Sequence, residues 1–493
     1  MVIVLLFIIP IITGLLCLVP KKRYLIGRIQ TLGMFALFLD GLIVVKNILN
    51  GNSVYSFKDV IYLDAISGIM IFLISFLSFL SSLYSIAYMV NEIEEKIPSE
   101  WKLKGYYFLL NLFILTMLML VTTNSIGILW ISIELTTLVS AFLVGYYNKE
   151  TPVEAAWKYI VLCTVGIAFA MIGIVLLYYA VTHAGGLREQ GLNWNYLITI
   201  AHKLDPNLMK VAFVFILIGF GTKAGLAPMH TWLPDAHSEA PTPVSALLSG
   251  VLLKCALYGI IRFAILINLA VDSNFTSHLL LFFGLLSIIV ATPFILVQKN
   301  IKRLLAYSSL EHIGIITTGL AFGNSLSVFG AFIHIINHAI VKSLMFFTAG
   351  NISLKFHTKD MDHIKGAAQI VPLSAFALIL GGLALAGAPP FSIFISEFYI
   401  LAGGIKENHL IASGLIIFLL TVIFGGLLYH FLKITIGPIN GLTNLSNAQL
   451  GRSSNFPVLI CLFVIVLLGV SIPSPLFRLV NEAVKIFSMG NTI

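Results

Sequence analysis

Charged side chains are scarce in this sequence. Asp, Glu, Lys and Arg make up 10% of its 493 residues, whereas 59% are hydrophobic. Soluble domains carry about 25% charged residues, and no soluble core needs apolar runs that recur along the whole chain. The composition excludes a soluble protein. It predicts an all-α polytopic membrane protein, because the runs suit helices of roughly 20 residues and not the ~10-residue alternating strands of a barrel.

Cysteine is also scarce, and the motifs that hold cofactors are missing. The chain has four widely separated cysteines, Cys17, Cys163, Cys255 and Cys461. No CxxC pair occurs, so neither an iron–sulfur cluster nor a disulfide framework is expected. There is no HExxH or nucleotide-binding motif, and we expect no cofactor. The net charge of +8 is spread over short loops, which argues against a nucleic-acid partner.

Apolar windows predict about fourteen transmembrane helices. The first run precedes its basic cluster, which indicates a retained helix instead of a signal peptide. Lys and Arg are in excess in alternate loops, and this bias predicts that both termini lie outside the cell membrane. No polar stretch is long enough for a separate soluble domain, so residues 1–493 form one membrane domain. The expected spans are 2–19, 25–48, 64–90, 105–122, 125–147, 154–182, 208–229, 241–268, 276–298, 300–322, 325–350, 368–400, 408–435 and 455–482.

Four ionisable residues stand out inside these apolar spans, namely Glu134, Lys223, Lys254 and Glu397. A charge at the bilayer centre costs at least about 2.5–3.5 kcal/mol, so such residues usually face the bundle interior and mark a pathway. Acids and bases spaced through the chain suit a series of proton-exchanging sites. The alternative is that Glu134 and Lys223 form a static ion pair that fixes helix packing.

A histidine-rich stripe lies in "GAFIHIINHAIVKSLMFF". His334, His338 and Lys342 are spaced by four residues and therefore share one helix face, and His312 lies one span earlier. Histidine titrates near neutral pH and can pass a proton between its ring nitrogens, which favours a proton relay. Two alternatives stay open: a metal ion shared by two histidines, and packing histidines bonded to serines or backbone. Without an obvious thiolate or carboxylate partner, no metal is expected.

Helix-breaking residues stand beside two of the intramembrane charges. They are Gly225 and Pro228, just after Lys223, and Gly387, Pro389 and Pro390, just before Glu397. Interrupted segments at matching positions of two halves indicate an internal repeat and an ion site. Backbone groups freed at that depth are tolerated only where protein or a water-filled cavity satisfies them. The lysine is therefore expected beside a hydrated break.

Two further polar groups have simpler interpretations. The segment "MHTWLPDAHSEAPTP" contains Asp235, His237 and Glu239 and is expected to be an ordered connecting loop. Glu154 and Lys158, spaced by four residues, are expected to form a surface pair, although such a pair could also help protons to enter.

One long segment of the sequence resembles the signature of a known family. The segment "GTKAGLAPMHTWLPDAHSEAPTPVSALLSGVLLK" resembles the signature of antiporter-like membrane subunits, which occur in complex I, multisubunit sodium/proton antiporters and membrane-bound hydrogenases. The resemblance extends through "EAAWKY", "NIKRLLAYSSLEHIG", "NHAIVKSLMFF" and "APPFSIFISEF", and thus covers most of residues 100–400.

The resemblance implies fourteen helices, discontinuous helices seven and twelve, and two inverted five-helix repeats, which we assign to residues 105–268 and 276–435. Glu134 resembles the family's helix-five glutamate, Lys223 its helix-seven lysine and Lys254 its helix-eight lysine. His312, His334 and His338 fall in the hydrophilic region that lies between the lysines of the first half and Glu397. Glu397 occupies the helix-twelve site, where many relatives carry lysine.

The resulting prediction is a proton-translocating subunit of a redox-driven respiratory complex or cation antiporter, without redox chemistry of its own. Its expected partners are other membrane subunits, the lipid bilayer, protons and, in one alternative, Na⁺. That alternative is a Na⁺/H⁺ antiporter subunit. A second alternative is a membrane subunit that binds a quinone or redox centre.

Overall fold

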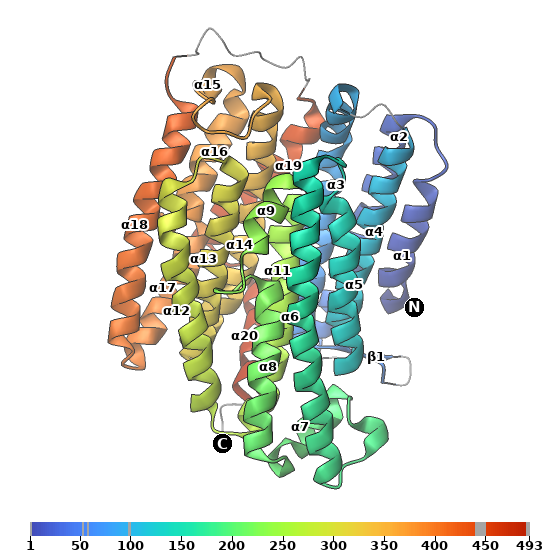
Figure 1. Ribbon diagram of the computed structural model, residues 1–493, viewed down its shortest axis with the longest axis vertical. Helices are drawn as coiled ribbons and strands as arrows, with labels where there is room; N and C mark the ends of the chain where they lie inside the picture. The colour runs from blue at the N-terminus through green and yellow to red at the C-terminus, as the bar shows by residue number, and fades with distance from the viewer. Residues whose placement is uncertain (1, 52–53, 57–58, 97–99, 439–449, 490–493) are drawn as a thin grey trace.

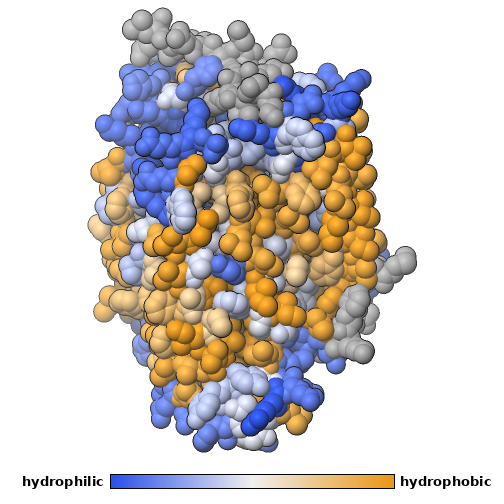
Figure 2. Space-filling view, turned by 45° about the vertical axis from the view of Figure 1, so that its right-hand side comes forward, coloured by the Kyte–Doolittle hydropathy of each residue, from blue (hydrophilic) through white to orange (hydrophobic). Residues whose placement is uncertain are grey.

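The computed structural model is a bundle of long helices aligned with its longest axis (Figure 1). It describes residues 2–51, 54–56, 59–96, 100–438 and 450–489. Among these residues, 11 helices are long and apolar enough to cross a membrane, and two shorter helices are also apolar. Figure 2 shows hydrophobic side chains forming a belt around the middle of one face, with hydrophilic residues at both ends. The expected polytopic helical architecture is confirmed.

The first part contains α1 (Val2–Leu16), α2 (Arg23–Leu49), α3 (Ala65–Lys96), α4 (Glu100–Thr122), α5 (Ile126–Val144), α6 (Glu150–His183), the 3₁₀ turns η1 (Arg188–Gln190) and η2 (Ala201–Lys203), α7 (Trp194–Ile200) and α8 (Pro206–Ala224). Strands β1 (Val54–Ser56) and β2 (Ile61–Leu63) form a small antiparallel hairpin between α2 and α3.

The remaining elements are α9 (Trp232–Glu239), α10 (Thr242–Leu247), the π-helical turn η3 (Leu248–Leu252), α11 (Leu253–Ala270), α12 (Ser273–Val297), α13 (Ile301–Ala321), α14 (Ser325–Phe356), α15 (Ala367–Ile370), α16 (Pro372–Leu385), α17 (Ser392–Lys406), α18 (Leu410–Thr435), α19 (Arg452–Val470) and α20 (Ser474–Ser488). Helices α10, α11 and α14 are enclosed by the others, and α7 and α15 lie at opposite ends of the bundle (Figure 1).

The last expected span, 455–482, is wrong as a single helix. Helix α19 ends at Val470, and α20 begins after Pro473. Helix α20 is amphipathic, because it buries Leu479 and Val480 while Glu482 and Lys485 stay exposed and paired with each other. A proline and a charged helix face explain why the apolar run does not continue.

Small residues let α6 and α8 approach closely. A Cβ added to Gly219 would lie 2.6 Å from the Ala170 nitrogen, and one added to Gly173 would lie 2.6 Å from the Ala212 oxygen. Backbones approach this closely only where side chains are absent, as is common between membrane helices. This contact fixes α8, which carries Lys223 in its last turn, against α6.

A buried ion pair joins α11 to the start of α3. The Arg262 guanidinium donates to both Asp64 carboxylate oxygens, at 2.6 and 2.7 Å, and also to the Ser67 hydroxyl. Their exposed fractions are 3% and 5%. The bidentate partner makes burial of the Arg262 guanidinium tolerable.

We expect the free energy of unfolding to fall more when one residue of the Asp64–Arg262 pair is replaced than when both are replaced. Arg262→Met leaves the Asp64 carboxylate buried and unpaired, so the free energy of unfolding should fall by about 3–5 kcal/mol. Adding Asp64→Asn should recover most of that loss, because no uncompensated charge is left. Denaturant unfolding of the purified protein in detergent measures both variants.

Lys485→Met is the matched control, since its pair with Glu482 is exposed and exposed pairs contribute at most about 1 kcal/mol. A double Asp64/Arg262 variant no more stable than Arg262→Met would contradict the pairing argument.

Candidate functional site

Two helix breaks of the same construction lie in the two halves of the bundle. Helix α8 ends at Gly225, whose φ is +81°, and the next N–H donates to the Gly221 carbonyl at 2.8 Å. After α16, Gly387 has a φ of +73°, and the next N–H again donates to the carbonyl five residues back, at 2.9 Å. A left-handed glycine with this bond satisfies the open end of a helix. The chain then resumes as α9 and α17.

Lys223 lies fully buried at the first break. Its Nζ donates to the Thr137 hydroxyl of α5 at 2.8 Å and to the Tyr159 hydroxyl of α6 at 2.5 Å. The Tyr159 hydroxyl also contacts the Ser140 hydroxyl, at 2.7 Å. Hydroxyls both donate and accept hydrogen bonds. The site can therefore hold either an ammonium or an amine.

Glu134 lies on α5 at the side of the bundle and is only partly buried. Its Oε1 accepts a hydrogen bond from the Thr164 hydroxyl of α6 at 2.7 Å, and its Oε2 is buried without a partner. Its carboxylate thus contacts a hydroxyl, while the Lys223 ammonium contacts other hydroxyls. The two residues form no direct ion pair, so the expected alternative of a static Glu134–Lys223 pair is not what the structure has.

Lys254 begins a chain of polar contacts that continues to the second half. It is buried near the start of α11, and its Nζ donates to the Ser249 carbonyl in the π-helical turn η3. The Ser249 hydroxyl lies 2.8 Å from the Ser309 hydroxyl of α13. Single π-helical turns occur frequently at functional sites, and this one connects Lys254 to α13.

Lys342 of α14 reaches the same segment of α13 from the other side. Its Nζ donates to the Leu305 carbonyl at 2.7 Å and to the Ser308 hydroxyl. Ser308 is adjacent to Ser309 in the chain, so Lys254 and Lys342 approach α13 at neighbouring serines.

The histidines form a compact cluster next to Lys342. His312 Nδ1 lies 2.9 Å from His334 Nε2, and His334 Nδ1 lies 2.9 Å from the Ser396 hydroxyl of α17. The ring centroids of His312 and His338 are 4.7 Å apart. His312 Nε2 and both nitrogens of His338 are buried without partners. These unpartnered nitrogens are available to take or give a proton.

Glu397 follows Ser396 and lies against the second break. A Cβ on Gly387 would collide with Glu397 Oε2, so the glycine makes the space that the carboxyl occupies. Ligand atoms of His312, His334 and Glu397 lie within 4.8 Å of one another, a spacing that could hold a metal ion. Both His334 nitrogens, however, already have hydrogen-bond partners.

The structure thus brings together Lys254, Lys342, the three histidines and Glu397, and it keeps Lys223 and Glu134 in a separate group around α5 and α6. Sequence analysis missed Glu311, which is buried beside His312. Its position inside the expected apolar span 300–322 could have identified Glu311 as a candidate. It also missed Tyr159, because a tyrosine in an apolar helix carries no comparable signal.

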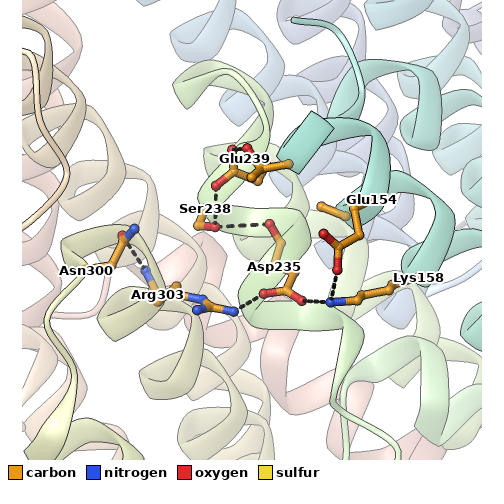
Figure 3. Close-up of a pocket in the computed structure, with 9 residues that line it drawn as sticks. Glu154, Lys158, Asp235, Ser238, Glu239, Asn300 and Arg303 are labelled. Atoms are coloured by element: carbon orange, nitrogen blue, oxygen red, sulfur yellow. Dashed lines mark hydrogen bonds and ion pairs between the residues drawn. The ribbon is translucent and has the colours of Figure 1, made fainter. Parts of the chain in front are cut away.

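A polar pocket of about 250 Å³ opens between α6, α9 and the start of α13. Asp235 lies at its centre and accepts from Lys158 at 3.3 Å and from Arg303 (Figure 3). Lys158 also pairs with Glu154 at 2.7 Å. The expected surface pair is therefore part of a charged network around an open pocket.

His237 lies on the same short helix, α9, as the pocket residue Asp235. It follows Asp235 by two residues, is fully buried, and neither of its ring nitrogens has a partner. Its ring stacks with Trp232, whose ring centroid lies 4.7 Å from that of Tyr159. The expected connecting loop is instead the helix α9.

Comparison with known proteins gives consistent matches. Residues 123–425 match the family described as "NADH:quinone oxidoreductase/Mrp antiporter, TM". The chain is 38% identical over 378 residues to a hydrogenase-4 component F homolog of Methylacidiphilum infernorum, covering 77% of this chain and 79% of the relative. It is 32% identical over 360 residues to hydrogenase-4 component B of Escherichia coli, covering 70% of this chain but only 51% of the relative.

A solved structure shares the fold over almost the whole chain. It is a chain of the membrane-bound sulfane sulfur reductase, described as an archaeal respiratory membrane complex. The TM-score is 0.86 at 26% sequence identity, and the match covers 99% of this chain and 97% of that chain.

The second break gives a prediction about stability. Gly387→Ala should lower the free energy of unfolding by about 1–2 kcal/mol from the left-handed backbone alone, and further because the new methyl group displaces the Glu397 carboxylate. In the double variant with Glu397→Ala, the contribution from the displaced carboxylate should disappear. The contribution from the left-handed backbone should remain. Thermal unfolding of the purified protein measures these differences.

Gly414→Ala serves as the control, because this helical glycine has open space around its Cβ position. The packing argument fails if Gly387→Ala and Gly414→Ala leave the protein equally stable.

Proposed function

Because the chain belongs to the NADH:quinone oxidoreductase/Mrp antiporter family of membrane subunits, we propose that it translocates protons along its buried Glu/Lys/His row as part of a larger redox-driven complex. The observation that carries the proposal is the sequence of buried contacts from Lys254 through Ser249 and Ser309 to α13, and from His312 through His334 to Ser396. Ionisable groups at this depth are costly and are retained where they exchange ions.

Glu134 and Lys223 form the part of the pathway that responds to a neighbouring subunit. Glu134 is the partly exposed member, so a charge that changes in an adjoining membrane protein acts on it first. Its field then alters the proton affinity of Lys223. Moving one charge against 100 mV costs about 2.3 kcal/mol, which corresponds to under about two pKa units. A change in the Lys223 pKa of that size is what the coupling to Glu134 must supply to drive transfer.

Protons enter through the pocket around Asp235. Its rim is exposed, with 58% of the Glu154 and 49% of the Lys158 side chain accessible, whereas Asp235 is only 19% exposed. His237 provides the next acceptor, since its unpartnered nitrogens are buried two residues away. In this scheme the proton passes from the pocket to His237, then to the lysines and histidines, and leaves beyond Glu397.

Several finer features belong to the same proposal. The chain has fourteen transmembrane helices with both termini outside, and residues 105–268 and 276–435 are inverted five-helix repeats. The matching hydrogen bonds at Gly225 and Gly387 support the repeat. Other membrane subunits adjoin the chain, as the name of the structurally similar complex says of that assembly.

The first functional test removes the lysine at the break. Lys223→Ala should abolish proton translocation while the complex still assembles, because the vacated site is lined by hydroxyls that can bind water. Proton uptake into inverted membrane vesicles, followed with a pH-sensitive dye during electron transfer by the intact complex, measures this effect. Sodium uptake measured in parallel distinguishes a Na⁺/H⁺ exchange from proton transport.

Lys203→Ala, which changes an exposed lysine ahead of α8, is the control and should pump normally. Undiminished proton transport in Lys223→Ala would refute the role of the buried row.

The second test addresses uptake at the pocket. Asp235→Asn removes the charge that holds Lys158 and Arg303 together, leaving two cations at the mouth that repel protons. Initial rates of proton transport should fall severalfold, without loss of the assembled complex. Glu482→Gln, a comparable loss of an exposed acid on α20, should leave the rate unchanged. Equal rates in the two variants would place uptake elsewhere.

A further inference from the structure

Glu311 is a buried carboxyl that the pathway described above does not use. It lies on α13 beside His312, with an exposed fraction of 1%. Its Oε2 has no hydrogen-bond partner among the described residues. An unpartnered carboxylate oxygen in a membrane interior is expensive. Something in its surroundings must compensate for its charge, or it must hold a proton.

Two charged residues act electrostatically on Glu311. They are Lys342 of α14, a cation, and Glu397 of α17, an acid. Lys342 also contacts the turn of α13 that precedes Glu311, through the Leu305 carbonyl and the Ser308 hydroxyl. Glu311 therefore stands on α13 between the turn that Lys342 contacts and His312, which has a ring nitrogen within 4.8 Å of a Glu397 oxygen.

This position fills a gap in the hydrogen-bonded row. Contacts lead from Lys254 to Ser309 and from His312 to Ser396, but within the part of the chain that the structure describes no hydrogen bond joins Lys342 to the histidines. Glu311 follows the serines by one turn of α13 and directly precedes His312. A carboxyl at this point can receive a proton from one side and release it to the other.

The order of the helices gives Glu311 a counterpart in the first half. Within the proposed repeats, α5 and α13 are both the second helix, and the broken segments α8–α9 and α16–α17 are both the fourth. Glu134 lies on α5 and Glu311 on α13. Each half thus has one acid on its second helix within the field of a buried lysine, Lys223 or Lys342.

We propose that Glu311 is a proton-exchanging residue of the second half, which balances the charge of Lys342 and passes protons between that lysine and the histidines. This inference rests on the proposed function. In the transfer, the Lys342 ammonium gives one proton to the Glu311 carboxylate, leaving a neutral amine and a carboxylic acid. The acid then gives the same proton to an unprotonated histidine nitrogen, so that carboxylate and imidazolium result. Glu397 receives it next.

The test compares variants at position 311 in the intact complex. Glu311→Gln keeps the shape but cannot release a proton, and should lower the initial rate of proton transport by at least about tenfold. Glu311→Asp keeps the carboxyl and should retain most of the transport. Thr317→Val, which alters a buried hydroxyl bonded only within α13, should have no effect.

Infrared difference spectra separate proton exchange from a structural role. The wild-type complex should show a carboxylic acid C=O band that appears and disappears when the complex is reduced and reoxidised. This band should be missing in Glu311→Gln and shifted in Glu311→Asp. If the band is unchanged in Glu311→Gln, or if this variant transports protons like wild type, the proposal is wrong.

A folding defect is recognised with a second variant. Glu311→Gln combined with Lys342→Met removes both charges, so it should assemble even if the single variant does not, because a buried cation is no longer left unpaired. An assembled double variant that still transports protons at the wild-type rate would overturn the role of Glu311. If wild type itself transports no protons, the proposed function fails instead, and the spectroscopic result then decides on Glu311 alone.

Discussion

The requirement that dominates this structure is that a lysine buried in a membrane must find polar partners within the protein for its amino group. Lys223 finds the hydroxyls of Thr137 and Tyr159, and Lys342 finds a carbonyl and a hydroxyl of α13. Such partners exist only where helices end, widen or carry hydroxyls, because an unbroken apolar helix offers none. The breaks, the π-helical turn and the serines therefore form one system with the charges.

Sequence patterns located the main features of that system because each has a strong local signature. A lysine followed by glycine and proline marks both a charge and the end of a helix, and Gly225 indeed ends α8 with a positive φ. The four-residue spacing of His334, His338 and Lys342 places them on one face, and the structure has them on α14 near His312. That these residues form a proton pathway is still a prediction.

Features that depend on distant parts of the chain could not be predicted. Nothing local indicates that Tyr159 accepts from a lysine 64 positions away, or that Arg262 pairs with Asp64. The division of the last apolar run into α19 and α20 was missed because the run looked continuous in composition. In these cases tertiary contacts decide the conformation, and composition alone describes only the average polarity of a segment.

If the proposed proton pathway runs through the contact between the Ser249 and Ser309 hydroxyls, that contact has a kinetic consequence. Each hydroxyl carries one hydrogen, so after a proton hopped through the pair both O–H bonds would point the other way, and a second proton could not follow until they rotated back. Side-chain rotations of this kind take picoseconds to nanoseconds when unhindered, far less than a typical turnover of milliseconds or longer. In that pathway the pair would reset between successive cycles, yet it would prevent two charges from crossing this point at the same moment.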